Sequence, residues 1–160
     1  MDDGYLRLMP HHFLDMLRAW APEWRTPPDS RLGHRFPAVV QQLLTDSGTH
    51  IEIAIGVDDV CTGCAARTTG YCAEPVDTTI RKAAPDNLQE YNELIDARLL
   101  KALGLSVGDR LTATELCARF ALLDDYSAIY SETPKKMMKE WNKRIKAGIV
   151  RYLDFSRTTR

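Results

Sequence analysis

The 160-residue chain has almost no net charge and no long apolar run. Its formal net charge is −1, from 21 basic and 22 acidic residues, which argues against a surface built for nucleic acid or membrane. The longest apolar run, around Ile53–Val57, is far short of the roughly 20 residues that span a bilayer. The N-terminus, Met1-Asp2-Asp3, lacks the positive charge and apolar stretch of a secretion signal. The sequence therefore predicts a cytoplasmic protein without a membrane segment.

The sequence also lacks the short motifs of several large enzyme classes. It contains no Walker phosphate loop, no dinucleotide-binding glycine fingerprint and no nucleophile elbow, so these classes lose support. It shows no internal repeat and no low-complexity tract. With 44% hydrophobic and 27% charged residues, the chain has an ordinary globular composition and is long enough to bury one core. We therefore expect a single domain.

Apolar periodicity and helix-capping residues predict an α-rich α+β fold, with about five helices and two or three short strands. Strands are expected at 5–9 and 50–56, and a turn at 107–110. Helices are expected at 10–20, 37–48, 86–103, 112–120 and from Pro134 onward. The clearest helix has the apolar stripe Leu88, Tyr91, Ile95, Leu99 and Ala102, with Gly104 as its C-cap.

The C-terminal segment 135–160 is strongly basic. It holds nine Lys or Arg residues against only Glu140 and Asp154. Its apolar stripe, which includes Met138, Trp141 and Ile145, predicts an amphipathic helix packed on the domain formed by residues 1–134. Two other uses of this helix stay open, a homodimer surface and a contact with nucleic acid or an acidic protein partner.

Three of the four cysteines, Cys61, Cys64 and Cys72, lie in one short loop. In a reducing cytoplasm, clustered cysteines indicate metal or redox chemistry rather than structural disulfides. Zinc sites commonly use two paired knuckles, and this loop has only one, which favours an iron–sulfur cluster with a remote fourth ligand. A zinc ion, a thiol–disulfide redox pair at Cys61 and Cys64, and thiols that bind nothing remain as alternatives.

The expected helix at 10–20 carries a histidine pair, His11 and His12, one turn before Asp15. Adjacent helical residues point about 100° apart, so the two histidines cannot share one role. Either histidine can share a face with Asp15, as a metal ligand or an oriented general base, whereas the plain alternative is a polar helix start. Cys117 lies alone on an apolar helix face and is therefore interpreted as a core residue, although it stays a candidate for the fourth ligand of the metal centre.

Three segments resemble the prokaryotic family called domain of unknown function 1284, whose members are described as iron–sulfur binding. They are "YLRLMPHHFLDML", "VDDVCTGCAARTTGYC" and "LLKALGLSVGDRLTATEL", which together cover roughly residues 5–118. The resemblance implies that His11 and His12 match the family's histidine pair and that Cys61, Cys64 and Cys72 match its cysteine loop. Asp15 stands where the family pattern has a further cysteine.

These observations predict a protein that binds one iron–sulfur cluster, of the 4Fe–4S type, through Cys61, Cys64 and Cys72. Asp15 is the first expectation for the fourth ligand, with His11, His12 and Cys117 as alternatives. A carboxylate binds cluster iron more weakly than a thiolate, which would leave one iron open. The expected role is redox or cluster-dependent catalysis on a small molecule, with His11 and His12 as acid–base residues and a redox partner left open. The alternative is a zinc-stabilised module whose basic C-terminal helix contacts nucleic acid or protein.

Overall fold

The structure is a computed structural model that describes residues 3–68 and 70–158. Its elements in chain order are β1 (Leu6–Leu8), α1 (Pro10–Ala19), α2 (Phe36–Thr45), β2 (His50–Ile53), a 3-10 turn η1 (Asp59–Cys61), β3 (Arg67–Thr68), β4 (Tyr71–Cys72), α3 (Leu88–Leu103), β5 (Arg110–Thr112), α4 (Ala113–Phe120) and α5 (Lys135–Thr158). The described residues thus confirm the predicted α-rich α+β fold in one domain. No helix in the described part of the chain is long and apolar enough to cross a membrane.

A small sheet with the strand order β1-β2-β5 joins two N-terminal strands to the segment just before α4. Strand β1 runs parallel to β2, with Leu6 opposite Ile51, and β5 runs antiparallel to β2, with Leu111 opposite Ile51. The two segments that carry the candidate site residues each follow a strand of this sheet. Helix α1 begins two residues after β1, and the cysteine loop follows β2.

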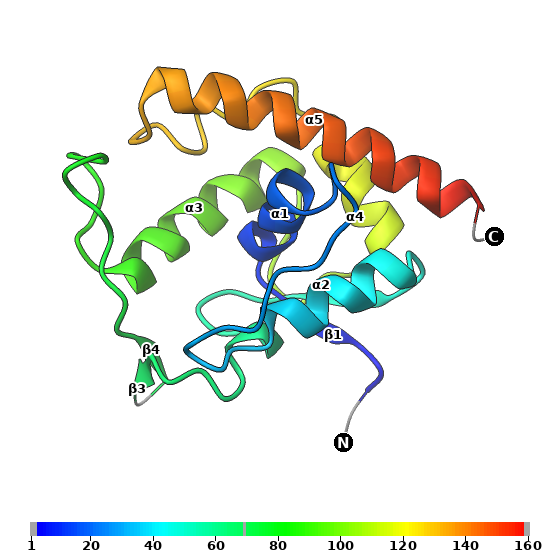
Figure 1. Cartoon of the computed structure of the whole chain (residues 1–160), viewed down its shortest axis with the longest axis horizontal. Coiled ribbons are helices and arrows are strands. Elements are labelled where there is room, and N and C mark those ends of the chain that lie inside the picture. The colour runs from blue at the N-terminus through cyan, green and yellow to red at the C-terminus, as the bar shows by residue number, and fades with distance from the viewer. Residues whose placement is uncertain (1–2, 69, 159–160) are drawn as a thin grey trace.

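Helix α1 is the centre of the molecule. Pro10 occupies its first turn, where a missing backbone N–H costs no hydrogen bond. One face of the helix buries Phe13, Met16 and Leu17 completely. Figure 1 shows α5 crossing one side of the molecule over α3, α1 and α4, and α1 contacts both α5 and α3. Side chains on α1 are therefore held from two directions.

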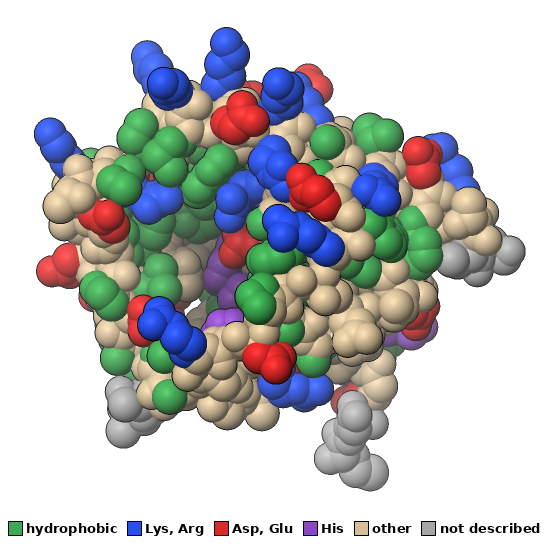
Figure 2. All heavy atoms as spheres, in the orientation of Figure 1, with side chains coloured by type: hydrophobic (Ala, Val, Ile, Leu, Met, Phe, Trp, Pro, Cys, Tyr) green, Lys and Arg blue, Asp and Glu red, His purple; other side chains and the backbone are tan. Residues whose placement is uncertain are grey.

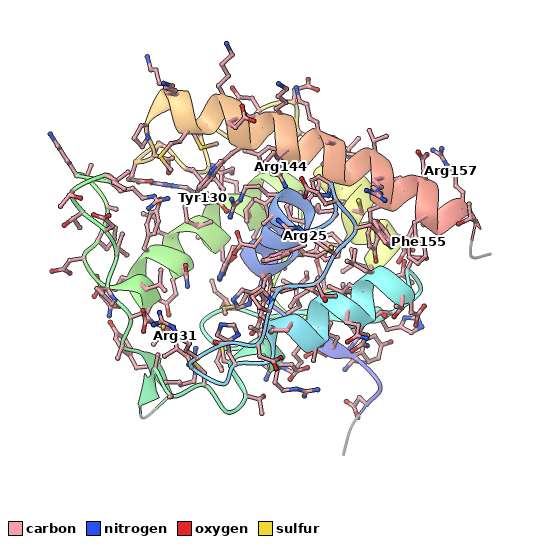
Figure 3. All side chains as sticks on the ribbon, viewed as in Figure 1. Arg25, Arg31, Tyr130, Arg144, Phe155 and Arg157 are labelled. Carbon is pink, nitrogen blue, oxygen red and sulfur yellow. The ribbon has the colours of Figure 1, made fainter. Side chains whose placement is uncertain are left out.

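Helix α5 packs tightly against α1. A Cβ added at Gly148 would lie 1.8 Å from the carbonyl oxygen of Leu17, so only glycine allows this approach. Arg144 extends from α5 toward α1 (Figure 3), donating through Nε to the Arg18 carbonyl at 3.0 Å and pairing with Glu23. The apolar stripe expected on α5 packs against the rest of the chain, because Met138 and Ile145 are buried and Trp141 is partly buried.

The opposite face of α5 is solvent-exposed and basic. Figure 2 shows lysine and arginine side chains projecting along this edge of the molecule. The exposed lysines of α5 are Lys135, Lys136, Lys139, Lys143 and Lys146. The helix therefore has the apolar inner face and basic outer face that its sequence predicts.

Helix α3 forms the wall beside the cysteine loop. Asn87 caps its N-terminus by accepting from the Glu90 amide, and Gly104 ends it in the left-handed conformation with φ 66°. Tyr91, Ile95 and Leu99 are buried, as the stripe predicts. Ala102 was expected on this stripe but is exposed, and Leu103 is buried in its place.

Candidate metal centre

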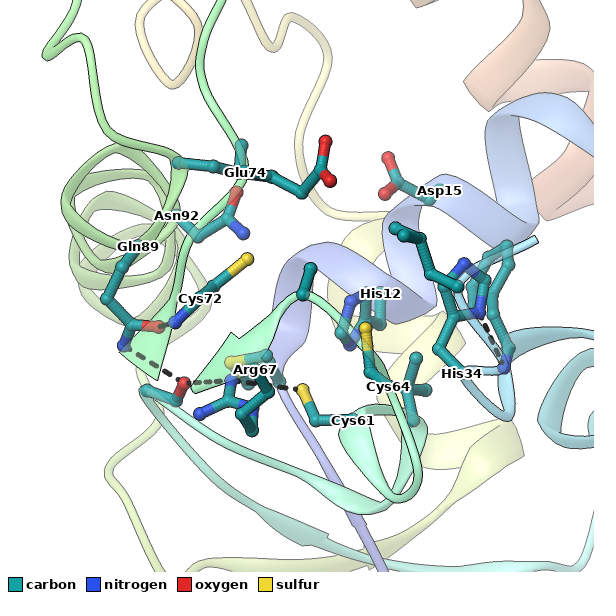
Figure 4. Close-up of a pocket in the computed structure, with 17 residues that line it drawn as sticks. His12, Asp15, His34, Cys61, Cys64, Arg67, Cys72, Glu74, Gln89 and Asn92 are labelled. Carbon is teal, nitrogen blue, oxygen red and sulfur yellow. Dashed lines mark hydrogen bonds between the residues drawn. The ribbon is translucent and has the colours of Figure 1, made fainter. Parts of the chain in front are cut away.

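The cysteine loop forms one wall of a cavity of about 330 Å³. We call it the cysteine cavity, and Figure 4 shows its lining. Cys61, Cys64 and Cys72 all line it and are free thiols of intermediate exposure. Its other polar lining residues come from α1, the segment before α2, β3, the chain after β4 and the start of α3: His12, Asp15, His34, Arg67, Glu74, Gln89 and Asn92.

Two glycines shape the loop so that its three cysteines face one space. Gly63 takes the left-handed conformation with φ 76° between Cys61 and Cys64. Gly70, with φ 78°, allows the tight β3–β4 hairpin in which Arg67 lies opposite Cys72. The hairpin therefore returns Cys72 to the cavity that Cys61 and Cys64 line. In Figure 4 the sulfur of Cys72 points into this space, and Asp15 and Glu74 face one another across one end of it.

Arg67 holds the loop from inside. Its Nη2 donates to Cys61 Sγ at 3.2 Å and to the Gly56 carbonyl at 3.0 Å, and its Nη1 donates to the Gly70 carbonyl. Burial raises the pKa of the Cys61 thiol, and the Arg67 hydrogen bond opposes that rise. The pKa of Cys61 stays above its ordinary value, but the guanidinium donor limits the rise and so reduces the cost of forming the thiolate that binds metal.

His12 is held in position by a buried carboxylate. Its Nδ1 lies 2.6 Å from Oδ2 of Asp58, which is only 3% exposed. The same carboxylate accepts from the Met9 amide at 2.7 Å and lies 3.4 Å from Cys61 Sγ through its other oxygen. Burial alone would raise the pKa of Asp58, but His12 and the Met9 amide bring it below its ordinary value. Because a carboxylate only accepts, His12 Nδ1 carries the proton and Nε2 is left for the cavity.

His11 points to a different cavity. Asp96, which is fully buried, accepts from both the His11 amide and its Nδ1 at 2.8 Å. Burial lowers the pKa of His11, but the charge and hydrogen bond of Asp96, with help from Asp15 and Asp58, raise it to about 9. The expectation that the two histidines cannot share one role therefore agrees with the geometry, although their rings lie only 4.2 Å apart.

Asp15 lies at the boundary of both cavities. Its carboxylate is 3.5 Å from Arg18 Nη2, one turn along α1. Among the described residues, the carboxylates that hydrogen-bond the histidines are Asp96 and Asp58. The idea that Asp15 orients either histidine through a hydrogen bond is therefore wrong, while its place on the cavity wall keeps it a candidate ligand.

Cys117 is part of the core. It is fully buried in α4, and its Sγ approaches the Ile149 carbonyl of α5 at 4.0 Å. Burial raises the pKa of this thiol to about 12. Since it does not line the cysteine cavity, it is removed from the candidate fourth ligands, and the core interpretation of this residue holds.

Sequence reasoning missed most of the polar residues around the cysteines. Asp58 carried a signal, because it belongs to the aspartate pair that leads into the loop. Arg67 lies between the cysteines but in a segment that reads only as small and polar. His34 carried no signal, because its loop is distant in sequence from both the histidine pair and the cysteines. Glu74 follows Cys72 by only two residues, so its position was a signal that sequence reasoning did not use.

The side chains around the cavity do not converge on one point. Within residues 3–68 and 70–158, no three His, Cys, Asp or Glu side chains lie close enough together to bind a single metal ion. Comparisons with protein-family models, curated proteins and solved structures gave no match. The resemblance to domain of unknown function 1284 therefore stays a prediction from the sequence.

Proposed function

We propose that this protein binds an iron–sulfur cluster of the 4Fe–4S type in the cysteine cavity, through Cys61, Cys64 and Cys72. The observation that carries the proposal is that these three thiols, contributed by η1, a turn and a hairpin, line one cavity. Free thiols used in this way require a reducing compartment, so the proposal includes a cytoplasmic location. The proposed role is redox chemistry or cluster-dependent catalysis on a small molecule.

The residues present fit such a group. A volume of about 330 Å³ lies within the range of small-ligand and cofactor sites. The Arg67 hydrogen bond to Cys61 Sγ is the kind of contact that tunes the potential of a cluster through its sulfurs. Each cysteine of a cluster binds a different iron, so the thiols need not converge on one point as the ligands of one zinc ion do.

Of the four residues that the sequence offers as the fourth ligand, two line the cysteine cavity. Asp15 lines the cavity and offers a carboxylate, the ligand that the sequence favours. His12 also lines it, and its Nδ1 contact with Asp58 is the arrangement that commonly orients a metal-binding imidazole. His11 and Cys117 are not candidates, because one lines a different cavity and the other lies in the core.

A bound cluster with one weak ligand would supply electron transfer or a Lewis-acidic iron. The chain's own residues would do the rest. His12, with its proton fixed on Nδ1 by Asp58, can accept or deliver a proton at Nε2. Arg67 would keep positive charge beside the thiolates, and the loop would limit the access of water to them.

The alternative, a zinc-stabilised module that uses α5 to contact nucleic acid or protein, is favoured only by the basic outer face of α5. In Figure 1 the hairpin β3–β4 and helix α5 lie on opposite sides of α3. A metal in the cysteine loop would therefore have no direct contact with α5. The packing of α5 on α1 already holds that helix in place.

Anaerobic purification followed by absorption spectroscopy and elemental analysis tests the proposal. Brown protein that contains iron and acid-labile sulfide in equal amounts is the expected result. Colourless protein with one tightly bound zinc ion, and no iron after reconstitution with ferrous iron and sulfide, would overturn the proposal and favour the alternative.

A further inference from the structure

A second cavity of about 210 Å³ lies beside the cysteine cavity. We call it the side cavity. Three residues, Asp15, Leu88 and Asn92, line both cavities, so the two are neighbours. Figure 2 shows this face of the molecule hollowed between hydrophobic and basic side chains, with histidine side chains at the bottom of the hollow. The remaining lining of the side cavity includes His11 of α1, Asp77 and Arg81 of the segment before α3, Ile95 of α3 and Trp141 of α5.

The carboxylates of the side cavity already have partners. Asp15 pairs with Arg18, which lies outside the lining, at 3.5 Å. Asp77 accepts from the backbone amide and hydroxyl of Thr79 and so stabilises its own turn. Asp96, behind His11, accepts two hydrogen bonds from that residue. The carboxylates around this cavity are therefore already paired with groups of the protein itself.

The guanidinium of Arg81 is different. Its Nε donates to Thr133 Oγ1 at 3.2 Å, which fixes the orientation of the group. The structure records no acceptor for its two terminal nitrogens among the described residues. An arginine anchored by Nε, with its terminal N–H groups unused at a cavity wall, suits a planar anion that accepts two hydrogen bonds.

The rest of the wall is apolar and aromatic. Trp141 faces the cavity, with the guanidinium carbons of Arg18 and Arg81 at 4.3 and 5.6 Å from its ring centroid. Leu88 and Ile95 add aliphatic surface from α3. Pockets with a mostly apolar lining and one fixed polar group generally take a small organic molecule that carries one polar end.

We propose that the side cavity binds a small organic carboxylate with an aromatic or aliphatic body. The carboxylate pairs with the terminal nitrogens of Arg81, and the body packs on Trp141 and Leu88. None of the three cysteines lines the side cavity, and Asp15 is the one candidate cluster ligand that does, so binding of the acid to Arg81 does not require the cluster.

The probes for this site are benzoate, phenylacetate and 3-phenylpropanoate, each paired with its neutral amide. Titration calorimetry should give saturable binding for at least one of the acids, with a dissociation constant below about 1 mM, and at least tenfold weaker binding for its amide. The same titration should change tryptophan fluorescence, and Trp141→Phe, which keeps an aromatic wall, should abolish that change.

Arg81→Gln should weaken the binding of the acid about tenfold or more, and should bring acid and amide to similar affinity. Lys82→Gln, an exposed neighbour outside the cavity lining, is the matched control and should bind like the unmodified chain. No saturable binding of any of the three acids, or equal binding by Arg81→Gln, would overturn the proposal.

A variant with Cys61, Cys64 and Cys72 all replaced by serine separates this proposal from the proposed function. It should bind the acid with unchanged affinity while it contains no iron. Loss of acid binding in this variant, with its circular dichroism spectrum unchanged, would contradict the independence of the two sites.

Discussion

The two adjacent histidines of α1 show how single contacts decide the role of a residue. His11 and His12 follow one another in the chain, yet His11 is tied to Asp96 of α3 and His12 to Asp58 beside the cysteine loop. One pair joins α1 to α3, and the other joins α1 to the candidate metal centre. Each imidazole therefore has a fixed orientation toward a separate cavity.

The His11–Asp96 pair predicts a pH dependence of stability. The pKa of His11 is about 9 in the folded chain and 6.5 in the unfolded chain, so the folded state binds the proton more tightly. This stabilisation is fully present below pH 6.5 and disappears as the pH rises through 9. It amounts to about 3 kcal/mol. Urea unfolding between pH 6 and 9.5 should show this loss.

The matched variant for that experiment is Asp96→Asn, which keeps the shape of the side chain and removes its charge. It should be less stable than the unmodified chain at pH 6, and the difference should shrink toward pH 9.5. Parallel stability curves for the two proteins would show that the pair does not titrate as described.

The fourth ligand is tested at Asp15. If Asp15 binds the cluster, Asp15→Cys should replace a weak oxygen ligand with a thiolate and lengthen the lifetime of the cluster in air. Glu74→Cys is the control, because it places a thiol on the opposite side of the same cavity. Absorbance decay under air measures both. Equal lifetimes for Asp15→Cys and the unmodified chain would remove Asp15 and leave His12.

At the residue scale, the sequence identifies candidate site residues better than it identifies the side chains that contact them. The three cysteines share a loop, so their spacing alone indicates a common site. Asp96 lies 85 residues from His11, and Asp58 lies 46 residues from His12. Only the packing of α1 against α3 and the loop brings them together, and no local pattern in one sequence encodes that contact.

At the scale of elements, the crossing of α1 and α5 is the tightest contact of the fold. Gly148→Ala would place a methyl group on the Leu17 carbonyl. The substitution raises helix propensity by about 1 kcal/mol, but overpacking of this kind costs about 1–3 kcal/mol or more. We expect a net loss of unfolding free energy in a urea titration.

Val150→Ala, on the exposed face of the same helix, is the control for this substitution. Val150 is 62% exposed, so its truncation should change the unfolding free energy by no more than about 0.5 kcal/mol. A Gly148→Ala variant that is as stable as this control would show that the two helices do not approach so closely.

Elements with strong local signals were predictable, including the short strands β1 and β2, whereas strand β5 was not. The capping box of Thr112 and Glu115 predicts the start of α4, and both of its hydrogen bonds are present. Strand β5 was missed, because the sequence of 107–110 predicts a turn and only Leu111 and Thr112 follow it before α4. Arg110–Thr112 becomes a strand because β2 offers it a partner, which is a tertiary effect.

At the scale of the whole molecule, the basic surface and the candidate metal centre lie in different places. The basic outer face of α5 and the cysteine loop lie on different sides of α3 (Figure 1). A basic face on a docked amphipathic helix keeps the helix solvated and needs no nucleic-acid partner. The proposed small-molecule or redox role therefore needs no contribution from the basic face of α5.

The chain should therefore show no saturable binding to a short DNA duplex or RNA hairpin at physiological salt. Fluorescence anisotropy with labelled oligonucleotides measures this directly. The comparison variant replaces the five exposed lysines of α5 with glutamine. Saturable binding that this variant loses would support the alternative function and contradict the expectation.

The most direct test of the central claim is the iron content of four single variants, purified without oxygen and reconstituted under the same conditions. Cys61→Ser, Cys64→Ser and Cys72→Ser should each lose most of the iron and the visible absorption of the cluster, because each removes a thiolate from one centre. Cys117→Ser should keep both, although it should be less stable because it places a hydroxyl in the core. Full iron retention in the three loop variants, or equal loss in all four, would contradict the claim that the cysteine loop binds an iron–sulfur cluster.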